Sequence, residues 1–427
     1  MIRSISINSV LFGSLIFFVI FQSSIYVVGE NAQYEPRILD ILPTVKDRNL
    51  IVQVVADGLE FPTNMAFLEE NDILVTEKNK GTLQRIINGE IKDTLLDVPV
   101  ATRSERGILG IAVSNNYTKD LNSPVNIYVY YTKSFTETDT NGTWPEKSSG
   151  NALYRYEFKD SKLSNPQLLL HLSPAKGVAH NGGSIIIGPD NNLYIPIGDG
   201  DGHTTLAQNI INGEDVDGTG GILTITQDGL SYNGLTSESD FGMKYYAYGI
   251  RNSFGIDFDP VTGNLWDTEN GNNDNDEINL VEPGFNSGWS KIQGMAPPGF
   301  NYSELVTFNG KGKYSDPEFV WNQTVGPTKI KFLESNQLGK QYENDIFVSD
   351  IKYGKIYHFD LNEVRDGLIL SGKLADKIAN KDKETKPVTF GEGFGGISDM
   401  KIGPDGYLYV LSFGHGKIYK IIPSNVT

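Results

Sequence analysis

The sequence predicts an all-β protein, a six-bladed β-propeller of four-stranded antiparallel sheets. Short runs of β-branched or alternating residues are separated by turns rich in Gly, Pro, Asp and Asn. One strand–turn–strand pattern returns about six times, and no long amphipathic helical pattern follows the N-terminal segment. Repeated small antiparallel sheets are typical of propellers, in which each blade buries its faces against its neighbours.

The repeats justify this prediction in chain order. The first, from Phe61 to Ile86, has a strand, an acidic turn, a second strand, a loop and a third strand, and the last, from Gly396 to Ile421, repeats all of it. Several repeats contain two strands joined by a Gly-Pro-Asp turn. A β-sandwich, a pair of packed β-sheets, does not explain why this strand pair returns with the same internal spacing. The copies between them are "RGILGIAVSNNYTKDLNSPVNIYVYYTKS" with "NALYRYEFKD", "GGSIIIGPDNNLYIPIGDGDG", "IRNSFGIDFDPVTGNLWDTENGNNDNDEINLV" and "PTKIKFLESNQLGKQYENDIFVSDIKYGKIYHFDL".

The N-terminal segment predicts export. Arg3 precedes an apolar stretch from Val10 to Val28, and Gly29 lies near a plausible cleavage point. We expect residues 1–29 to be a signal peptide or, as the alternative, a membrane anchor, because the stretch is nearly long enough to span a bilayer. Residues 30–48 are then expected to form a linker and residues 49–424 the six-bladed propeller domain, which we expect to be secreted or extracytoplasmic.

Composition excludes some functions. A formal net charge of −17 argues against nucleic acid as a partner, and it is compatible with bound divalent cations or with simple solubility. The chain has no cysteine, which excludes disulfides, iron–sulfur clusters and thiol chemistry.

Four polar residues stand at the entries and exits of repeats. His180 precedes the Gly-Pro-Asp strand pair and Asp199 follows it. A His–Asp pair across one sheet fixes the imidazole tautomer of a general base, whereas a polar turn histidine beside an unrelated Asp loop is the alternative. Arg251 and Asn252 enter the next repeat at an analogous position. The guanidinium can hold a carboxylate or carbonyl oxygen, or form a salt bridge between blades.

The stretch from Thr268 to Ser290 is rich in oxygen ligands. It contains five carboxylates, several amide side chains and glycine-supported carbonyls. Such ligands suit Ca²⁺ rather than zinc, although the spacing is not that of an EF-hand. The alternative is a solvated acidic turn.

Five pieces in this order resemble the soluble quinoprotein glucose/sorbosone dehydrogenases, also called aldose sugar dehydrogenases. The pieces are "ERGILGIAV", "HNGGSIIIGPDNNLYIPIGD", "YGIRN", "DEINLVEPGFNSGW" and "IKYGKIY", and the resemblance extends from Gly58 to Ile421. It implies a six-bladed propeller with pyrroloquinoline quinone (PQQ) and Ca²⁺ as cofactors. It also implies oxidation of the C1 hydroxyl of an aldose to a lactone by hydride transfer to the quinone, with an external electron acceptor as partner.

The resemblance also implies residue roles. His180 matches the family's catalytic base, Asp199 the carboxylate that supports it, and Arg251 a catalytic residue that contacts the quinone oxygens. The other matches are Glu105, Asn252, Asn270 and Lys352 for the cofactor, the backbone carbonyls of Gly271 and Asn272 for the catalytic Ca²⁺, and Glu277 with the Ser287 carbonyl for a structural Ca²⁺.

The last repeat departs from the family. Gly396-Ile397-Ser398-Asp399 stand where the family has an Arg-x-Arg-Asp motif that holds the quinone carboxylates. Each missing charge-assisted hydrogen bond costs about 1.5–3 kcal/mol, and strand alternation points the nearby Lys401 elsewhere. Two alternatives therefore stay open: a non-catalytic calcium-binding propeller that binds a carbohydrate or protein, and a calcium-dependent lactonase-like hydrolase.

Overall fold

The computed structural model describes residues 42–114, 124–141, 148–174, 177–202, 204–232, 234–235 and 240–426. The expected signal peptide or anchor (1–29) and most of the expected linker lie outside these residues. Within them, no helix has the length and apolarity needed to cross a membrane.

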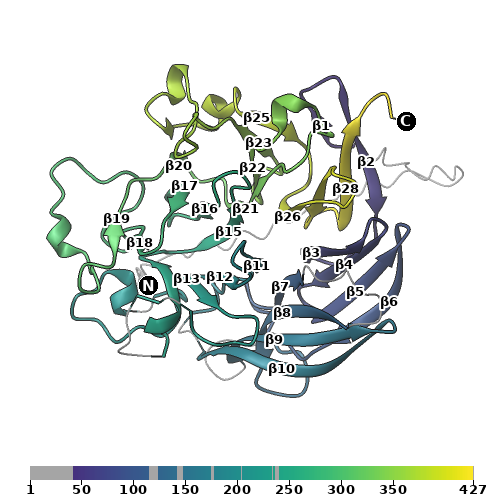
Figure 1. The fold of residues 1–427 in the computed structure, drawn as a ribbon, viewed down its shortest axis with the longest axis horizontal. Helices are drawn as coiled ribbons and strands as arrows, with labels where there is room; N and C mark the ends of the chain where they lie inside the picture. The colour runs from purple at the N-terminus through teal and green to yellow at the C-terminus, as the bar shows by residue number, and fades with distance from the viewer. Residues whose placement is uncertain are drawn as a thin grey trace, which may run out of the picture. The chain divides into compact units, whose positions relative to one another are not determined.

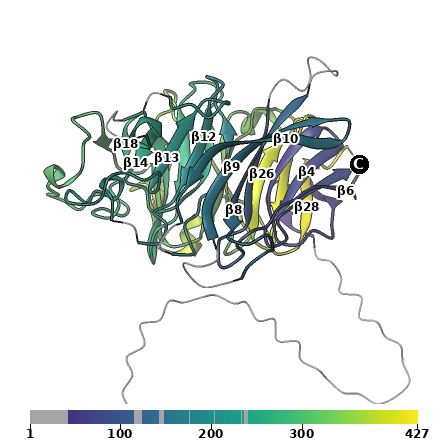
Figure 2. The ribbon, with the colours of Figure 1, turned by 90° about the horizontal axis from the view of Figure 1, so that it is seen from below.

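The described strands form six sheets, each named here after its strand nearest the centre of the ring (Figure 1). The β3 sheet contains β3 (Pro62–Glu69), β4 (Asp72–Glu77), β5 (Thr82–Ile87) and β6 (Glu90–Asp97). The β7 sheet contains β7 (Ile108–Val113), β8 (Val125–Ser134), β9 (Ser148–Lys159) and β10 (Lys162–Leu172). The β11 sheet contains β11 (Ile186–Ile187), β12 (Leu193–Ile197), β13 (Gly221–Ile225), β14 (Tyr245–Tyr248), β18 (Phe285–Asn286) and β19 (Lys313–Tyr314). Figure 2 shows β12, β13, β14 and β18 in this order.

The other three sheets complete the ring. The β15 sheet contains β15 (Ser253–Phe258), β16 (Leu265–Glu269), β17 (Asp274–Val281), β20 (Phe319–Gln323) and β24 (Ile378–Ala379). The β21 sheet contains β21 (Pro327–Phe332), β22 (Ile346–Asp350), β23 (Ile356–Phe359), β25 (Thr389–Glu392) and β1 (Thr44–Val45). The β26 sheet contains β26 (Ile397–Ile402), β27 (Leu408–Ser412), β28 (Lys417–Pro423) and β2 (Leu50–Ala56). Short 3₁₀ helices lie in the connections: η1 (Leu206–Gln208), η2 (Gly242–Lys244), η3 (Tyr302–Glu304), η4 (Lys340–Tyr342), η5 (Gly372–Leu374) and η6 (Asp382–Thr385).

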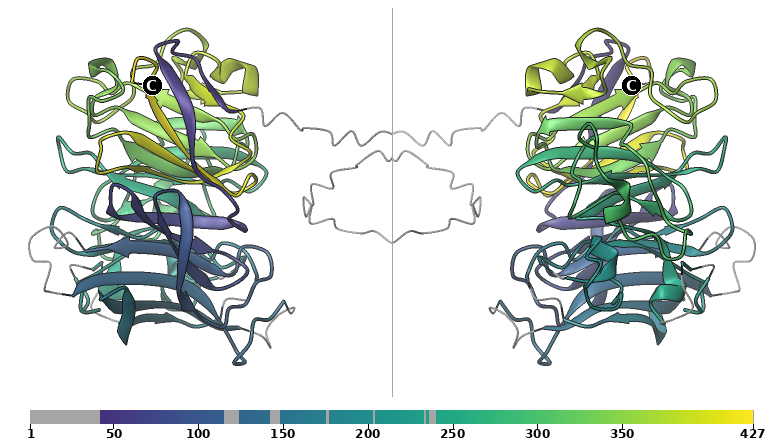
Figure 3. Two further views of the ribbon diagram at one scale, coloured as in Figure 1. Left: turned by 90° about the vertical axis from the view of Figure 1, so that its right-hand side faces the viewer. Right: turned by 90° about the vertical axis from the view of Figure 1, so that its left-hand side faces the viewer.

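The two ends of the described chain meet in one sheet. Strand β2 pairs with β28, so that Leu50 lies opposite Pro423, and Figure 3 shows the purple strand beside the yellow ones. Strand β26 of this sheet contacts both β21 and β3, which closes the ring. A closed ring leaves few sheet edges exposed.

The predicted all-β fold is confirmed, but only three of the six sheets have the predicted four strands. The β11 sheet has six strands, and the β15 and β21 sheets have five each. The extra strands β18, β19 and β24 come from the long connections after β17 and β23, and β1 comes from the start of the described chain and pairs with β25. Three of these pairings, β18 on β14, β19 on β18 and β24 on β20, are parallel, against the predicted antiparallel pattern.

The Gly-Pro-Asp turns are structural. The carboxylate of Asp190 accepts hydrogen bonds from the Asn192 backbone N–H and from the Tyr194 hydroxyl, at 3.1 and 3.0 Å. Asp405 does the same for the Tyr407 N–H and the Tyr409 hydroxyl, at 3.2 and 2.9 Å. This shared chemistry explains why the motif returns in different repeats.

The innermost strands run in the same direction around the ring. Hydroxyl groups at the starts of three of them bond to the start of the next strand. These bonds join Thr63 to the Ile108 carbonyl at 2.8 Å, Thr328 to the Ile397 carbonyl at 2.6 Å, and Ser398 to the Pro62 carbonyl at 2.7 Å. Loops at the starts of the innermost strands therefore meet at one end of the ring, which we call the mouth.

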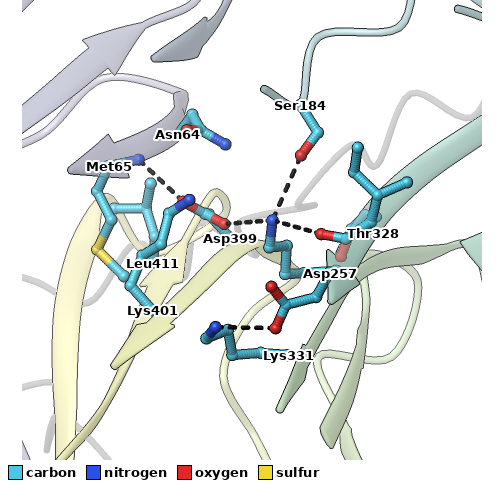
Figure 4. A network of polar contacts seen from close by, with 12 residues as sticks. Asn64, Met65, Ser184, Asp257, Thr328, Lys331, Asp399, Lys401 and Leu411 are labelled. Carbon is cyan, nitrogen blue, oxygen red and sulfur yellow. Dashed lines mark hydrogen bonds and ion pairs between the residues drawn. The ribbon is translucent and has the colours of Figure 1, made fainter. Parts of the chain in front are cut away.

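A buried polar cluster occupies the centre of the ring (Figure 4). The Lys329 ammonium lies 3.3 Å from the Ser184 hydroxyl, 3.4 Å from the Ile256 carbonyl and 3.9 Å from the Asp399 carboxylate. Burial, followed by the charge of Lys401, lowers the pKa of Lys329 to about 7. We call this group the central cluster.

Candidate active site

His180 and Asp199 form a buried pair at the mouth. The His180 Nδ1–H donates to Asp199 Oδ1 at 2.5 Å, and only 8% of His180 is exposed. His180 has φ +60°, an unusual backbone conformation for a residue with a side chain. The close packing requires Gly198, because a Cβ there would lie 2.6 Å from the His180 Cβ and 2.9 Å from Asn252 Oδ1.

Asp199 is fully engaged by donors. Its Oδ2 accepts from the Trp289 indole N–H at 2.9 Å, and its Oδ1 also accepts from the Asp201 N–H at 3.0 Å. Burial works to raise the pKa of Asp199, but the hydrogen bond and charge of His180, the Asp201 N–H and the charge of Arg251 outweigh it and lower the pKa. Asp199 is therefore held ionised beside the imidazole.

Glu105 holds the backbone of His180 rather than its ring. The Glu105 carboxylate accepts the His180 N–H at 2.6 Å. The next residue, Arg106, is almost fully buried and donates to the Gly177 carbonyl at 2.7 Å. Lys78 is buried against the same loop, where its ammonium donates to the Thr102 carbonyl at 3.3 Å. The sequence pattern singled out neither of these two cations.

Arg251 contacts the oxygen-rich loop that was predicted to bind calcium. Its Nη1 donates to the carbonyls of Asn270 and Gly271 at 2.9 and 2.7 Å, and its Nη2 reaches Asn272 Oδ1 at 3.4 Å. The guanidinium also lies over the Trp289 ring, 5.6 Å from its centroid. A Ca²⁺ ion on the Gly271 carbonyl would face this cation, so the arrangement does not fit the predicted catalytic Ca²⁺ at Gly271 and Asn272.

Asp276 fixes the same loop from beneath. Its Oδ1 accepts the Gly271 N–H at 2.9 Å, and its Oδ2 accepts the N–H groups of Val325 and Gly326 at 2.6 and 2.8 Å. Asn270 donates to the Pro327 carbonyl at 3.0 Å, which ties the loop to the next sheet. The loop is therefore rigidly placed at the mouth.

Asn252 presents an unsatisfied acceptor. Its Oδ1 is buried and has no hydrogen-bond partner among the described residues. This oxygen lies next to Gly198, the residue before Asp199. The Asp199 N–H donates to the carbonyl of Arg251, the residue before Asn252, at 2.7 Å. Asn252 therefore belongs to the same cluster as the His–Asp pair. A buried oxygen left unpaired indicates a place for a ligand donor.

Lys352 lies at the same end of its sheet but apart from this cluster. Its ammonium donates to the Thr324 carbonyl at 2.9 Å and lies 5.2 Å from the Tyr353 ring centroid. In the described structure it makes no direct contact with His180 or Arg251.

Glu269 and Glu277 form a fully buried acidic pair beneath the mouth. The Ser287 hydroxyl donates to both, at 2.6 and 3.4 Å. Burial and the charge of Glu277 raise the pKa of Glu269 well above its usual value, and burial raises that of Glu277 to about 7. Burial also raises the pKa of the neighbouring Asp267 to about 7, and both Asp267 oxygens have no partner in the described part of the chain. This set of hard oxygens would suit a divalent cation such as Ca²⁺, with Glu269 as an additional candidate ligand. The structural Ca²⁺ expected at Glu277 and the Ser287 carbonyl stays a prediction.

The last repeat supplies no guanidinium. Ser398 bonds to the neighbouring strand, as described above, and the Lys401 side chain lies in the central cluster. The Lys401 ammonium lies 3.8 Å from Asp399 Oδ2. Lys401 also lines a cavity of about 500 Å³ together with Lys331 and Gly406, at the opposite end of the ring. Lys401 therefore does not replace the missing arginines.

A family model for glucose/sorbosone dehydrogenases matches residues 59–420. The chain belongs to this family. It is 26% identical over 390 residues to aldose sugar dehydrogenase YliI of Escherichia coli (strain K12), a match of 88% of this chain and 93% of that protein. It is 30% identical over 277 residues to quinoprotein glucose dehydrogenase B of Acinetobacter calcoaceticus, covering 58% and 54% of the two chains.

Solved structures share the fold. The apo-form of the soluble E. coli aldose sugar dehydrogenase superposes with a TM-score of 0.67 at 23% identity, over 88% of this chain and 99% of that one. The PQQ-bound aldose sugar dehydrogenase of Streptomyces coelicolor gives 0.62 at 24%, over 89% and 99%. The family resemblance and the propeller fold are thus confirmed, and the family comprises sugar dehydrogenases that include PQQ-binding propellers.

Proposed function

We propose that the protein is a PQQ- and Ca²⁺-dependent dehydrogenase that oxidises the C1 hydroxyl of aldoses to lactones. The observation that carries this proposal is the buried His180–Asp199 pair, joined at the mouth by Arg251 and by the unsatisfied Asn252 oxygen. As part of the proposal, we take each of the six sheets as one blade. Export through the N-terminal segment and an external electron acceptor complete the proposal.

The chemistry of the donor set suits a flat polyanion. Arg251 and Lys352 offer cations for carboxylates and quinone oxygens, and Asn252 offers a free acceptor. When bound, the quinone supplies the acceptor for the hydride of the sugar C1. Ca²⁺ fits the buried pair of Glu269 and Glu277, where it supports the loop beneath the mouth.

His180 acts as the general base. Because its Nδ1–H is donated to Asp199, its Nε2 is left as the acceptor and takes the proton of the C1 hydroxyl. Asp199 then stabilises the imidazolium, and the Trp289 N–H and the Asp201 N–H hold the carboxylate in place. Arg251 is oriented by the loop carbonyls toward the same cluster.

A second candidate is a calcium-binding propeller that has lost the quinone and binds a carbohydrate or protein. It is favoured by the absence of both arginines at Gly396 and Ser398, while the acidic pair still fits a cation. The lactonase-like alternative requires a metal held on the axis by several blades. The Lys329 ammonium of the central cluster lies on this axis, and its positive charge disfavours a metal ion and therefore the lactonase-like alternative.

The test is reconstitution of the purified protein with PQQ and Ca²⁺. We expect bound quinone in an absorbance titration and aldose-dependent reduction of a dye. His180→Asn keeps the left-handed backbone conformation, which asparagine tolerates, and removes the base. We expect this variant to bind quinone normally and to lose dye reduction by about 10²–10⁴-fold.

His171→Asn is the matched control, because His171 is exposed on an outer strand. It should retain full turnover. Absence of quinone binding in the wild-type protein would refute the dehydrogenase and favour the second candidate.

A further inference from the structure

Among the described residues, the buried Lys78 ammonium has no carboxylate within hydrogen-bond or ion-pair distance. Lys78 is 9% exposed, and its Nζ donates to two neutral oxygens in the described part of the chain, Asn79 Oδ1 at 2.9 Å and the Thr102 carbonyl at 3.3 Å. The other two buried lysines of the described chain differ. Lys244 has Asp240 at 2.6 Å, and Lys329 has Asp399 at 3.9 Å.

The fold places Lys78 at the mouth. It follows β4 at the end of the sheet where Pro62 pairs with Glu77. Its carbonyl accepts the Ile108 N–H at 3.1 Å. Gly107 allows this packing, because a Cβ there would lie 2.7 Å from the Lys78 Cγ.

Lys78 and His180 both interact with one carboxylate, that of Glu105. The charge of Glu105 acts on Lys78, and the same carboxylate accepts the His180 N–H at 2.6 Å. Arg106, in the same loop, leaves its Nε buried and without a partner in the described structure. Two cations with unsatisfied hydrogen-bonding capacity therefore border the catalytic pair.

The energetic cost of this arrangement is visible in the titration of Lys78. Burial lowers the pKa of its ammonium to about 8, and the charge of Glu105 offsets this only in part. A buried charge without an ion partner is costly, and an anionic ligand group in hydrogen-bond contact would remove much of that cost.

We propose that Lys78 forms an anion subsite beside His180 that binds a carboxylate of the ligand. The proposal deepens the proposed function and rests on it for the position of the ligand. Two sources share this chemistry. One is a carboxylate of the quinone, for which Lys78 would supply a cation that the last repeat, with Gly396 and Ser398, does not provide. The other is the carboxylate of an acidic sugar.

The test compares Lys78→Met with Lys80→Met. Lys80 lies in the same loop, but its side chain is 44% exposed and pairs with Glu60 at 2.8 Å. Quinone binding is measured by tryptophan fluorescence, and binding of D-glucuronate and D-glucose by calorimetry. We expect Lys78→Met to lower the affinity for one of the two carboxylate ligands by about tenfold or more and to leave the affinity for D-glucose unchanged. Lys80→Met should bind all three ligands as the wild-type protein does.

The same variant should unfold at an equal or higher urea concentration, because methionine removes a buried unpaired charge. Loss of affinity together with retained stability distinguishes a ligand contact from a structural role. Acylation of Lys78 in the wild-type protein, followed by mass spectrometry, gives a second measure, since the bound carboxylate should protect the amine.

The ligand affected identifies the source. Weaker PQQ binding indicates the quinone carboxylate, and weaker glucuronate binding with unchanged PQQ binding indicates an acidic sugar. If the wild-type protein binds glucuronate through Lys78 but no quinone, the dehydrogenase proposal fails and the subsite stands. Unchanged affinity for both ligands in Lys78→Met, or binding of neither by the wild-type protein, would overturn the subsite.

Discussion

The mouth and the central cluster are both buried and polar, but their charges are paired differently. At the mouth, Asp199 accepts three hydrogen bonds of 2.5, 2.9 and 3.0 Å. In the central cluster, Asp399 Oδ2 accepts the Met65 N–H at 3.0 Å, whereas Oδ1 has no hydrogen-bond partner in the described chain. The lysines around Asp399 stay 3.8 and 3.9 Å away.

The difference separates two uses of a buried carboxylate. Short, charge-assisted hydrogen bonds fix orientation, which a proton-transfer group needs. Charges almost 4 Å apart still attract each other, but they impose little geometry. We infer that substitutions at the mouth change chemistry and that substitutions in the central cluster change stability.

Asp199→Asn gives the largest expected effect and tests the first half of this comparison. The amide keeps the shape but removes the charge that supports an imidazolium, and in either orientation its N–H₂ faces a donor, the His180 Nδ1–H or the Trp289 N–H. We expect dye reduction with glucose to fall by about 10²–10⁴-fold in the reconstituted protein. A fall of less than tenfold would show that the pair does not perform the proton transfer.

Asp399→Asn tests the second half. Without the carboxylate, Lys329, whose pKa burial and Lys401 already lower to about 7, loses the Asp399 charge that favours its protonated form. We expect a loss of about 3–5 kcal/mol in the free energy of unfolding measured in urea, with the affinity for PQQ unchanged.

The control for Asp399→Asn is Asp228→Asn. Asp228 is exposed and pairs with Arg155 at the surface, so this substitution should cost about 1 kcal/mol or less. A similar cost for both variants would mean that the central cluster does not stabilise the ring.

Local repetition explains what could be predicted from the sequence. The Gly-Pro-Asp turns carry their own hydrogen bonds, as at Asp190 and Asp405, so the strand pairs that they join are visible in the sequence. His180 and Asp199 lie in one such repeat, and their pairing follows from the strands between them. The extra outer strands could not be predicted, because β18 and β24 are short and obtain their pairing from a distant part of the chain.

Contacts between sheets explain what was missed at the site. Trp289 binds Asp199 across 90 residues, from the connection that follows β17, and no local pattern signals that contact. Lys78 lies in "EKNKG", a polar stretch that is typical of a solvent-exposed loop. Its burial comes from the loop around Thr102 and from the space left by Gly107. The family resemblance assigned the carbonyl of Gly271 to a metal, and no local pattern indicates its contact with Arg251.

The smallest expected effect concerns pH and sharpens the comparison at Lys78. Its pKa of about 8 in the folded chain lies below the ordinary value of 10.5, so between these values the unfolded chain binds more protons. The free energy of unfolding therefore rises with pH through this window, by at most about 3 kcal/mol from this group. Lys78→Met lacks the group, so urea unfolding at pH 7.5 and pH 10 should show a smaller rise for the variant than for the wild-type protein. Equal rises in both proteins would mean that the Lys78 ammonium reaches solvent. The mouth would then lack a buried, unpaired cation. That cation is what distinguishes the mouth from the central cluster, where the buried Lys329 has Asp399 nearby.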